Sequence, residues 1–144
     1  MSKIFKTKRI ARFGECDPAG VVYYPNYFNW FHQTMELWFE EALGVSYAQV
    51  IKDYGFPTVE TSASYRAPVF MGDEVELLLS IEKLGGSSIR FRIVVMGKEQ
   101  KVRTVGMIQT VCISIQEGQF QFQSSQVPVA LREKMLAYVE AASR

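Results

Sequence analysis

The sequence has 144 residues, 48% of them apolar, and a formal net charge of +1. This length fits one domain, residues 1–144, with a sizeable core and no room for a separate cofactor module. The near-neutral charge gives no general attraction to nucleic acid or membranes, and the basic N-terminal stretch lacks the apolar run of a signal peptide. We therefore expect a cytoplasmic protein with neither nucleic acid nor membrane as a partner.

The first predicted elements are a strand, a loop and a long helix. Residues Lys3–Phe13 alternate loosely and are rich in β-forming side chains, which predicts a strand. Residues Asn26–Leu43 contain no Gly or Pro and predict a helix, with Pro25 at its N1 position and Gly44 as its C′ residue. This helix is apolar except for one narrow stripe at offsets of three and four, formed by Asn29, His32, Gln33, Glu36 and Glu40.

The period changes to two after a shorter predicted helix over Ser46–Tyr54. Strands are then expected at Thr58–Ala67, Glu74–Glu82, Ser88–Met96, Lys101–Ile115 and Phe120–Phe122, with a turn at Glu117–Gly118 and a terminal helix at Val129–Ala142. In the second and third of these strands, alternate residues form apolar faces: Val75, Leu77, Leu79 and Ile81, then Ile89, Phe91, Ile93 and Val95. The fourth strand groups Val105, Met107, Val111, Ile113 and Ile115 on one side, with Gln109 as the exception.

This order of elements predicts an α+β fold. One strand, a long apolar helix and an antiparallel meander favour a curved antiparallel sheet wrapped around a long central helix. A single sheet on one helix leaves strand edges and an outer face uncovered. We therefore expect at least a homodimer, with neighbouring sheets joined edge to edge.

The loop before the long helix carries the clearest chemical signal. Asp17 lies in a tight turn a few residues before the helix begins. A helix start has unpaired backbone N–H groups and a positive partial charge, so it can stabilise an oxygen that becomes negative during a reaction. Because Pro25 has no N–H, the Tyr24 amide is the candidate donor. A carboxylate beside such an amide indicates hydrolysis of an activated acyl group such as a thioester.

Cysteine and histidine content excludes other chemistry. Two cysteines, Cys16 and Cys112, and one histidine are too few for a zinc cluster or a CxxC redox pair. The negative charge of Asp17 raises the pKa of the neighbouring Cys16 thiol, which disfavours a cysteine nucleophile. We expect neither a metal nor an organic cofactor.

One long motif resembles the hot-dog-fold acyl-CoA thioesterases, in particular the 4-hydroxybenzoyl-CoA thioesterase type. It comprises Phe13-Gly14-Glu15-Cys16, then Asp17-Pro18-Ala19-Gly20-Val21-Val22-Tyr23-Tyr24-Pro25-Asn26-Tyr27, and Trp30 in the helix. The resemblance, which extends over most of the chain, implies that the Asp17 carboxylate is catalytic and that the Tyr24 backbone N–H polarises the thioester carbonyl. It also implies dimers that pair into homotetramers, with active sites at subunit interfaces.

The resemblance further implies substrate contacts. Where the 4-hydroxybenzoyl enzyme has an aspartate on the phenol hydroxyl, this sequence has His32, whose imidazole can still donate or accept a hydrogen bond. The alternative is a structural histidine in the core or at an interface, with its hydrogen bonds satisfied by neighbouring groups. Tyr23, Tyr27 and Trp30 are candidates for the acyl pocket, although aromatic residues at helical spacing are usually core.

Coenzyme A itself is part of the substrate. The family contacts it near the Gly85–Ser88 segment, but the consecutive basic residues expected there are absent from this sequence. Lys83, Arg90 and Arg66 are the remaining candidates for nucleotide contacts.

We predict an acyl-CoA thioesterase that releases a carboxylic acid and free coenzyme A, with an aromatic, 4-hydroxybenzoyl- or benzoyl-like acyl group as first choice. The rivals are a thioesterase acting on acyl carrier protein or on aliphatic acyl-CoA, and a non-catalytic acyl-CoA-binding protein. Two roles stay open for Asp17: a nucleophile that forms an anhydride, or a general base that activates water.

Overall fold

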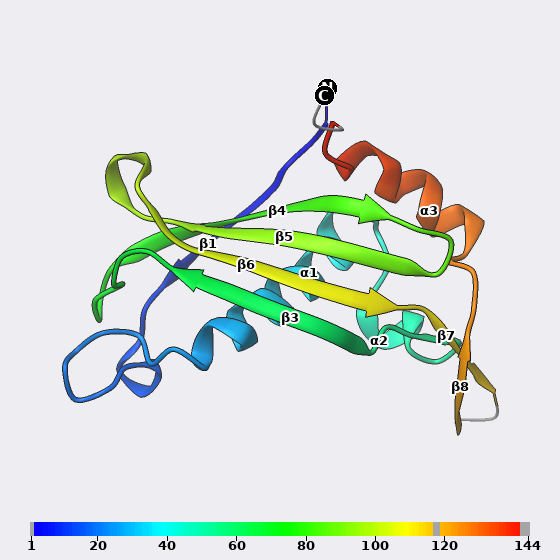
Figure 1. The fold of residues 1–144 in the computed structure, drawn as a ribbon, viewed down its shortest axis with the longest axis horizontal. Helices are drawn as coiled ribbons and strands as arrows, with labels where there is room; N and C mark the ends of the chain where they lie inside the picture. The colour runs from blue at the N-terminus through cyan, green and yellow to red at the C-terminus, as the bar shows by residue number, and fades with distance from the viewer. Residues whose placement is uncertain (1, 117–118, 142–144) are drawn as a thin grey trace.

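The computed structural model describes residues 2–116 and 119–141 (Figure 1). Its main sheet is antiparallel, with the strand order β1-β4-β5-β6-β3. These strands are β1 (Phe5–Ile10), β3 (Thr58–Tyr65), β4 (Glu74–Leu84), β5 (Ser88–Met96) and β6 (Val102–Val111). A second sheet with the order β2-β7-β8 contains β2 (Tyr54–Gly55), β7 (Ile113–Gln116) and β8 (Gln119–Ser124). The predicted turn at Glu117–Gly118 lies outside the described residues.

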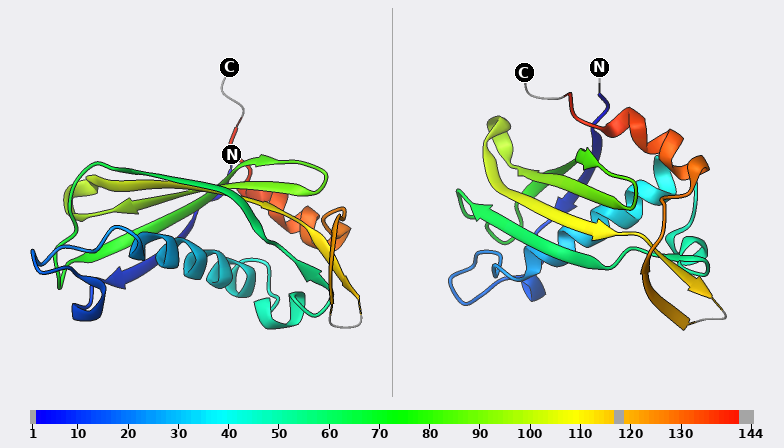
Figure 2. Two further views of the ribbon diagram at one scale, coloured as in Figure 1. Left: turned by 60° about the horizontal axis from the view of Figure 1, so that its bottom comes forward. Right: turned by 45° about the vertical axis from the view of Figure 1, so that its right-hand side comes forward.

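The longest helix, α1 (Asn26–Glu41), lies along one face of the main sheet (Figure 2). Most of its apolar side chains are buried, and Trp30, Phe31, Trp38 and Phe39 are each at most 1% exposed. The sheet side of this core comes from alternate residues of β4 and β5, as predicted: Val75, Leu77, Leu79, Ile81, Ile89, Phe91, Ile93 and Val95. The predicted α+β arrangement of an antiparallel sheet packed on a helix is therefore confirmed.

The buried face of strand β6 consists of Ile108 and three smaller residues rather than the apolar residues that the sequence grouped together. Thr104, Gly106, Ile108 and Thr110 are the buried positions of the strand. Val105, Met107 and Val111 do share a side, but it is the outer one, and Gln109 belongs to it. The bulk of the helix explains this choice, because a Cβ at Gly106 would overlap the Phe31 ring. The predicted grouping with Ile113 and Ile115 is wrong, because β6 ends at Val111 and those residues lie in β7.

Several predicted boundaries also shift. Helix α2 (Tyr47–Val50) is only four residues long, because the chain enters β2 at Tyr54. Helix α3 (Val129–Met135) gives way to a 3-10 turn at Leu136–Tyr138, after which Val139 bridges Ile81 of β4. Pro25 is the N-cap of α1 rather than N1, although its dihedral angles, φ −64° and ψ −24°, are already helical. Helix α1 ends at Glu41 with Ala42 as its C-cap, so Gly44 lies two residues after the cap rather than at C′, although its φ of +74° is the left-handed conformation expected of a glycine that ends a helix.

Within residues 2–116 and 119–141, no helix has both the length and the apolar character needed to cross a membrane.

Candidate active site

The loop that carries Asp17 is a small antiparallel ladder. At its base, the Glu15 carbonyl accepts the Tyr23 N–H at 2.9 Å, and nearer the tip the Asp17 N–H donates to the Val21 carbonyl at 2.9 Å. The turn closes when the Gly20 N–H donates to the Asp17 carbonyl at 2.9 Å, with Gly20 at a φ of +81° that favours glycine. The ladder thus carries the chain from Asp17 directly back to the start of α1.

The Asp17 side chain is partly exposed at the tip of this ladder. Its Oδ1 accepts the Ala19 N–H at 2.9 Å, which makes an Asx turn. Among the residues that the structure describes, the carboxylate is therefore held by its own turn and not by an ion pair, and an asparagine could accept the same hydrogen bond.

Helix α1 begins with a tight turn that leaves the Tyr24 amide free. The Tyr27 N–H donates to the Tyr24 carbonyl at 3.3 Å and the Phe28 N–H donates to the Pro25 carbonyl at 3.2 Å, both with 3-10 spacing. Within residues 2–116 and 119–141, the Tyr24 N–H has no hydrogen-bond acceptor. An unpaired N–H at a helix start is the donor that the sequence predicted.

A pocket of about 320 Å³ lies next to this amide. Its walls come from the ladder, from the first turn of α1 and from the end of β3: Val21, Val22, Tyr24, Tyr27, Tyr65, Arg66, Ala67 and Pro68. Asp17 does not line the pocket itself but is joined to its wall through the backbone bond to Val21. The pocket therefore has an apolar and aromatic wall and one cation, and the residue that carries the candidate backbone donor, Tyr24, is part of that wall.

The predicted aromatic residues take different places around this pocket. Tyr23 and Tyr24 are 50% and 58% exposed, and their rings meet edge to face with centroids 5.4 Å apart. Tyr27 is 3% exposed but still lines the pocket, and burial raises the pKa of its hydroxyl. Trp30 is 1% exposed and packs in the core, so within this chain it does not reach the pocket.

His32 lies on the outward stripe of α1. Its Nε2 is 2.7 Å from Glu36 Oε1, and its ring meets Tyr47 edge to face, with centroids 5.9 Å apart. Tyr24 is eight positions earlier, which corresponds to roughly 12 Å along the helix axis. Within one chain, the structure does not bring His32 to the Tyr24 pocket.

Two residues of this corner were not predicted as site residues. The Tyr65 hydroxyl donates to the Tyr24 carbonyl at 3.4 Å, and burial followed by the nearby Tyr24 raises the pKa of Tyr65. Tyr65 lies 41 positions beyond Tyr24, and no local pattern in the sequence links the two residues.

Glu15, the second of these residues, joins the loop to α1. It is part of the motif quoted above, but nothing in the sequence indicated the contacts that its side chain makes.

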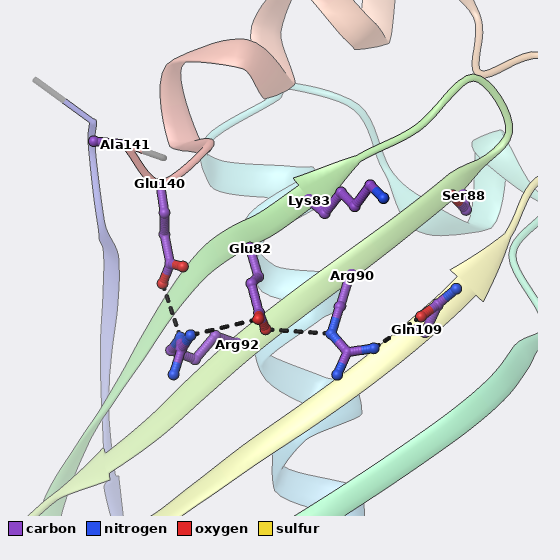
Figure 3. Close-up of a pocket in the computed structure, with 8 residues that line it drawn as sticks. All are labelled: Glu82, Lys83, Ser88, Arg90, Arg92, Gln109, Glu140 and Ala141. Carbon is purple, nitrogen blue, oxygen red and sulfur yellow. Dashed lines mark hydrogen bonds and ion pairs between the residues drawn. The ribbon is translucent and has the colours of Figure 1, made fainter. Parts of the chain in front are cut away.

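A second pocket, of about 490 Å³, lies on the outer face of the main sheet (Figure 3). It contains two of the predicted nucleotide-binding candidates, Lys83 and Arg90. Arg90 is already engaged by Glu82 at 3.3 Å and by Gln109 at 3.1 Å, while Lys83 points away from these pairs. The third candidate, Arg66, lines the Tyr24 pocket instead.

Both cysteines are free thiols. Burial, then the negative charges of Glu15 and Asp17, raise the pKa of Cys16, as the sequence predicted. Burial raises the pKa of Cys112 to about 11. Neither thiol is therefore set up as a nucleophile.

The sequence of this chain is similar to those of known proteins. Residues 11–137 match the model of the family described as "Thioesterase-like superfamily". A 1,4-dihydroxy-2-naphthoyl-CoA hydrolase of Prochlorococcus marinus (strain NATL2A) is 34% identical over 59% of this chain and 60% of its own length. The chain thus spans less than two thirds of that relative.

A second relative matches over more of its length. The 1,4-dihydroxy-2-naphthoyl-CoA hydrolase of Synechococcus elongatus (strain ATCC 33912 / PCC 7942 / FACHB-805) is 30% identical over 80% of this chain and 85% of its own length. Among solved structures, a gentisyl-coenzyme A thioesterase is similar with a TM-score of 0.77 and 26% identity, over 92% of this chain and 99% of that one.

Proposed function

This chain belongs to the thioesterase-like superfamily, and on that premise we propose that it hydrolyses an aromatic acyl-CoA thioester to a carboxylic acid and free coenzyme A. The observation that carries the proposal is the Tyr24 amide, which has no acceptor within the described residues and belongs to a residue that lines a pocket at the end of the ladder that holds Asp17. A thioester needs little further activation, so one carboxylate and one such donor suffice for its hydrolysis.

The proposed reaction begins when the thioester carbonyl oxygen accepts the Tyr24 N–H. This bond strengthens as the oxygen becomes negative, and the positive end of α1 adds to the stabilisation. Asp17 then either attacks the carbonyl carbon and forms an anhydride that water cleaves, or removes a proton from the attacking water. In both routes the C–S bond breaks and coenzyme A leaves as its thiol or thiolate. In the general-base route the acyl group gains its oxygen directly from water. In the anhydride route it keeps an Asp17 oxygen, which water replaces when it attacks the Asp17 carboxyl carbon.

The acyl group that we propose is a hydroxylated aromatic one. Tyr24, Tyr27 and Tyr65 give the pocket an aromatic wall, which suits a planar ring. The sequence motif suggested a 4-hydroxybenzoyl group, and the relatives named above are hydrolases of 1,4-dihydroxy-2-naphthoyl-CoA. A hydroxylated ring is common to both, so both acyl groups belong to the proposed class.

Release of free thiol from a panel of substrates tests this proposal. The panel holds 1,4-dihydroxy-2-naphthoyl-, 4-hydroxybenzoyl-, benzoyl- and straight-chain acyl-CoA, and the best acyl group is also offered on acyl carrier protein. We expect the highest kcat/KM with a hydroxylated aromatic acyl-CoA. A higher kcat/KM with the acyl carrier protein or with straight-chain acyl-CoA would contradict the proposed aromatic acyl-CoA substrate. Tight binding without thiol release would indicate a non-catalytic acyl-CoA-binding protein.

We further propose that the chain forms a homodimer, or a dimer of dimers, through the edge strand β3. The two edges of the main sheet differ in charge. Strand β1 carries Lys6, Lys8 and Arg9, which discourage pairing with another edge. Seven of the eight residues of β3 are exposed, and Glu60 is its only charged residue. Because β3 ends at Tyr65, a partner strand paired along it would bring the second subunit to the Tyr24 pocket.

A lysine in the middle of β3 should dissociate this dimer. Ser62 is exposed on the edge, and Ser62→Lys places a charge where the partner strand would pair. In size-exclusion chromatography with light scattering, we expect the wild type at a multiple of its 16.4 kDa chain mass and the variant at the mass of one chain. Lys6→Glu on β1 is the matched control and should keep the wild-type mass. An unchanged oligomer in Ser62→Lys would assign the interface to another surface.

A cytoplasmic location and hydrolysis without a metal or an organic cofactor stay predictions of the sequence. Dialysis of the active enzyme against a chelator, followed by the thiol-release assay, tests the second of them.

A further inference from the structure

One carboxylate outside the proposed catalytic pair gathers an unusual set of contacts. Glu15 Oε2 accepts the Trp30 Nε1–H at 2.6 Å and also pairs with the Arg9 guanidinium. Its Oε1 accepts the Arg12 N–H at 2.9 Å. These donors come from α1, from β1 and from the residue before the 3-10 turn Phe13–Glu15. The Glu15 side chain is 19% exposed, so most of this network is shielded from water.

The backbone of the same residue ties the other half of the loop. Its carbonyl accepts the Tyr23 N–H at 2.9 Å and the Asn26 Nδ2–H at 2.8 Å. Asp17 lies two residues after Glu15 on one side of the ladder, and Tyr24 follows Tyr23 on the other side. Glu15 is therefore the residue from which both groups of the proposed site are held.

A second layer of contacts keeps the carboxylate charged and in place. The Arg9 guanidinium carbon lies 4.9 Å from the centre of the Trp30 ring, and Arg9 Nη1 donates to Gln33 Oε1 at 2.6 Å. Partial burial alone would raise the pKa of Glu15. The hydrogen bonds from Trp30, Arg12 and Arg9, with the Arg9 charge, outweigh burial and hold this pKa below its usual value. The network is thus built around an ionised carboxylate.

We infer that Glu15 is a positioning residue, whose carboxylate and carbonyl hold the Asp17 ladder against the start of α1 and so fix Asp17 relative to the Tyr24 amide. This inference rests on the proposed function. The contacts of Glu15 converge on the ladder and on the first turns of α1, whereas the core is formed by apolar residues of α1 and the main sheet. Loss of the carboxylate should therefore misplace the reacting groups without removing the core.

Kinetics of two Glu15 variants test the inference. In Glu15→Ala, kcat should fall roughly 30-fold with KM within about threefold of wild type, because a misplacement of about 1 Å at a reacting group can cost 10²-fold. Glu15→Gln keeps one acceptor and loses the charge, so its kcat should lie between those of Glu15→Ala and wild type. Glu74→Gln is the matched control: it removes another carboxylate paired with a β1 cation, Lys8 at 3.7 Å, and should leave kcat unchanged.

A double-mutant cycle then identifies the contact through which Glu15 acts. Trp30→Phe removes the indole N–H and keeps an aromatic ring in the core. If the Trp30 bond transmits the effect, Trp30→Phe should cost much less in the Glu15→Ala background, which offers no acceptor to the indole N–H, than in wild type. Additive losses in kcat would overturn the role given to this bond.

Hydrogen exchange separates the inference from the proposed function. We expect faster exchange of the Gly20 and Tyr23 amides in Glu15→Ala, with exchange in β4 and β5 unchanged. A wild-type kcat in Glu15→Ala overturns the inference, and so does acceleration throughout the main sheet, which would mean that Glu15 only supports the fold. If wild type releases no thiol from any substrate, the proposed function fails, and the exchange of these two amides still decides whether Glu15 holds the ladder.

Discussion

Replacing Asp17 by Asn should lower kcat for aromatic acyl-CoA hydrolysis by about 10³-fold, because a neutral amide can neither attack a thioester nor remove a proton from water. The loop should survive the change. Asp17 Oδ1 accepts the Ala19 N–H at 2.9 Å, and the carbonyl oxygen of an asparagine accepts the same bond. We therefore expect an unchanged melting temperature and unchanged affinity for a non-hydrolysable thioether analogue, measured by calorimetry.

The matched control for Asp17→Asn lies in the neighbouring turn. Asp73 Oδ2 accepts the Phe70 N–H at 2.9 Å, so Asp73→Asn makes the same chemical change in a similar turn and should alter kcat less than twofold. Turnover near the wild-type value in Asp17→Asn would remove Asp17 from the reaction. A single turnover in H₂¹⁸O separates its two roles, since the anhydride route transfers ¹⁸O into the Asp17 carboxyl group and the general-base route does not.

The second large effect concerns stability. Gly106→Val should lower the free energy of unfolding by about 3 kcal/mol, because the new side chain would overlap the Phe31 ring in a fully packed core. Thermal unfolding followed by circular dichroism should show a melting temperature lower by roughly 10 °C.

Two further variants show whether Phe31 causes that loss. A Cβ added at Gly14 would meet no other atom within 4 Å, so Gly14→Val should change stability by less than about 0.5 kcal/mol. Phe31→Ala alone should cost about 3–5 kcal/mol. Combined with Gly106→Val it should cost clearly less, because the valine fills space that the ring leaves. Additive losses would show that strain at Gly106 arises elsewhere.

The fold was predictable where one face of an element is uniformly apolar. Strand β5 alternates without exception, β4 alternates except at the buried Ser80, and the apolar buried residues of both strands were predicted one by one. Strand β6 was not predictable in the same way. Gly106 is buried because it accommodates Phe31, a contact across 75 positions that no local pattern encodes. The small size of α2 has a similar cause, since Tyr54 pairs with Ser114 of β7 and ends the helical pattern early.

The candidate site was predictable as far as it depends on one continuous segment. The unpaired Tyr24 amide follows from Pro25 and the helix start, and the Asp17 turn follows from its own motif. The contacts of Glu15 and Tyr65 could not be predicted, because Arg9, Trp30 and β3 reach them only after the chain has folded. The role of His32 could not be predicted either, because this residue lies on the face of α1 that is exposed in a single chain.

On the proposed mechanism, the donor at position 24 belongs to the main chain, and Tyr24 as a residue is 58% exposed. Selection for a new acyl group could therefore replace the Tyr24 ring, or its neighbour at position 23, without deleting the hydrogen bond on which turnover depends. The scaffold separates the inherited chemistry from the parts that evolution is free to vary.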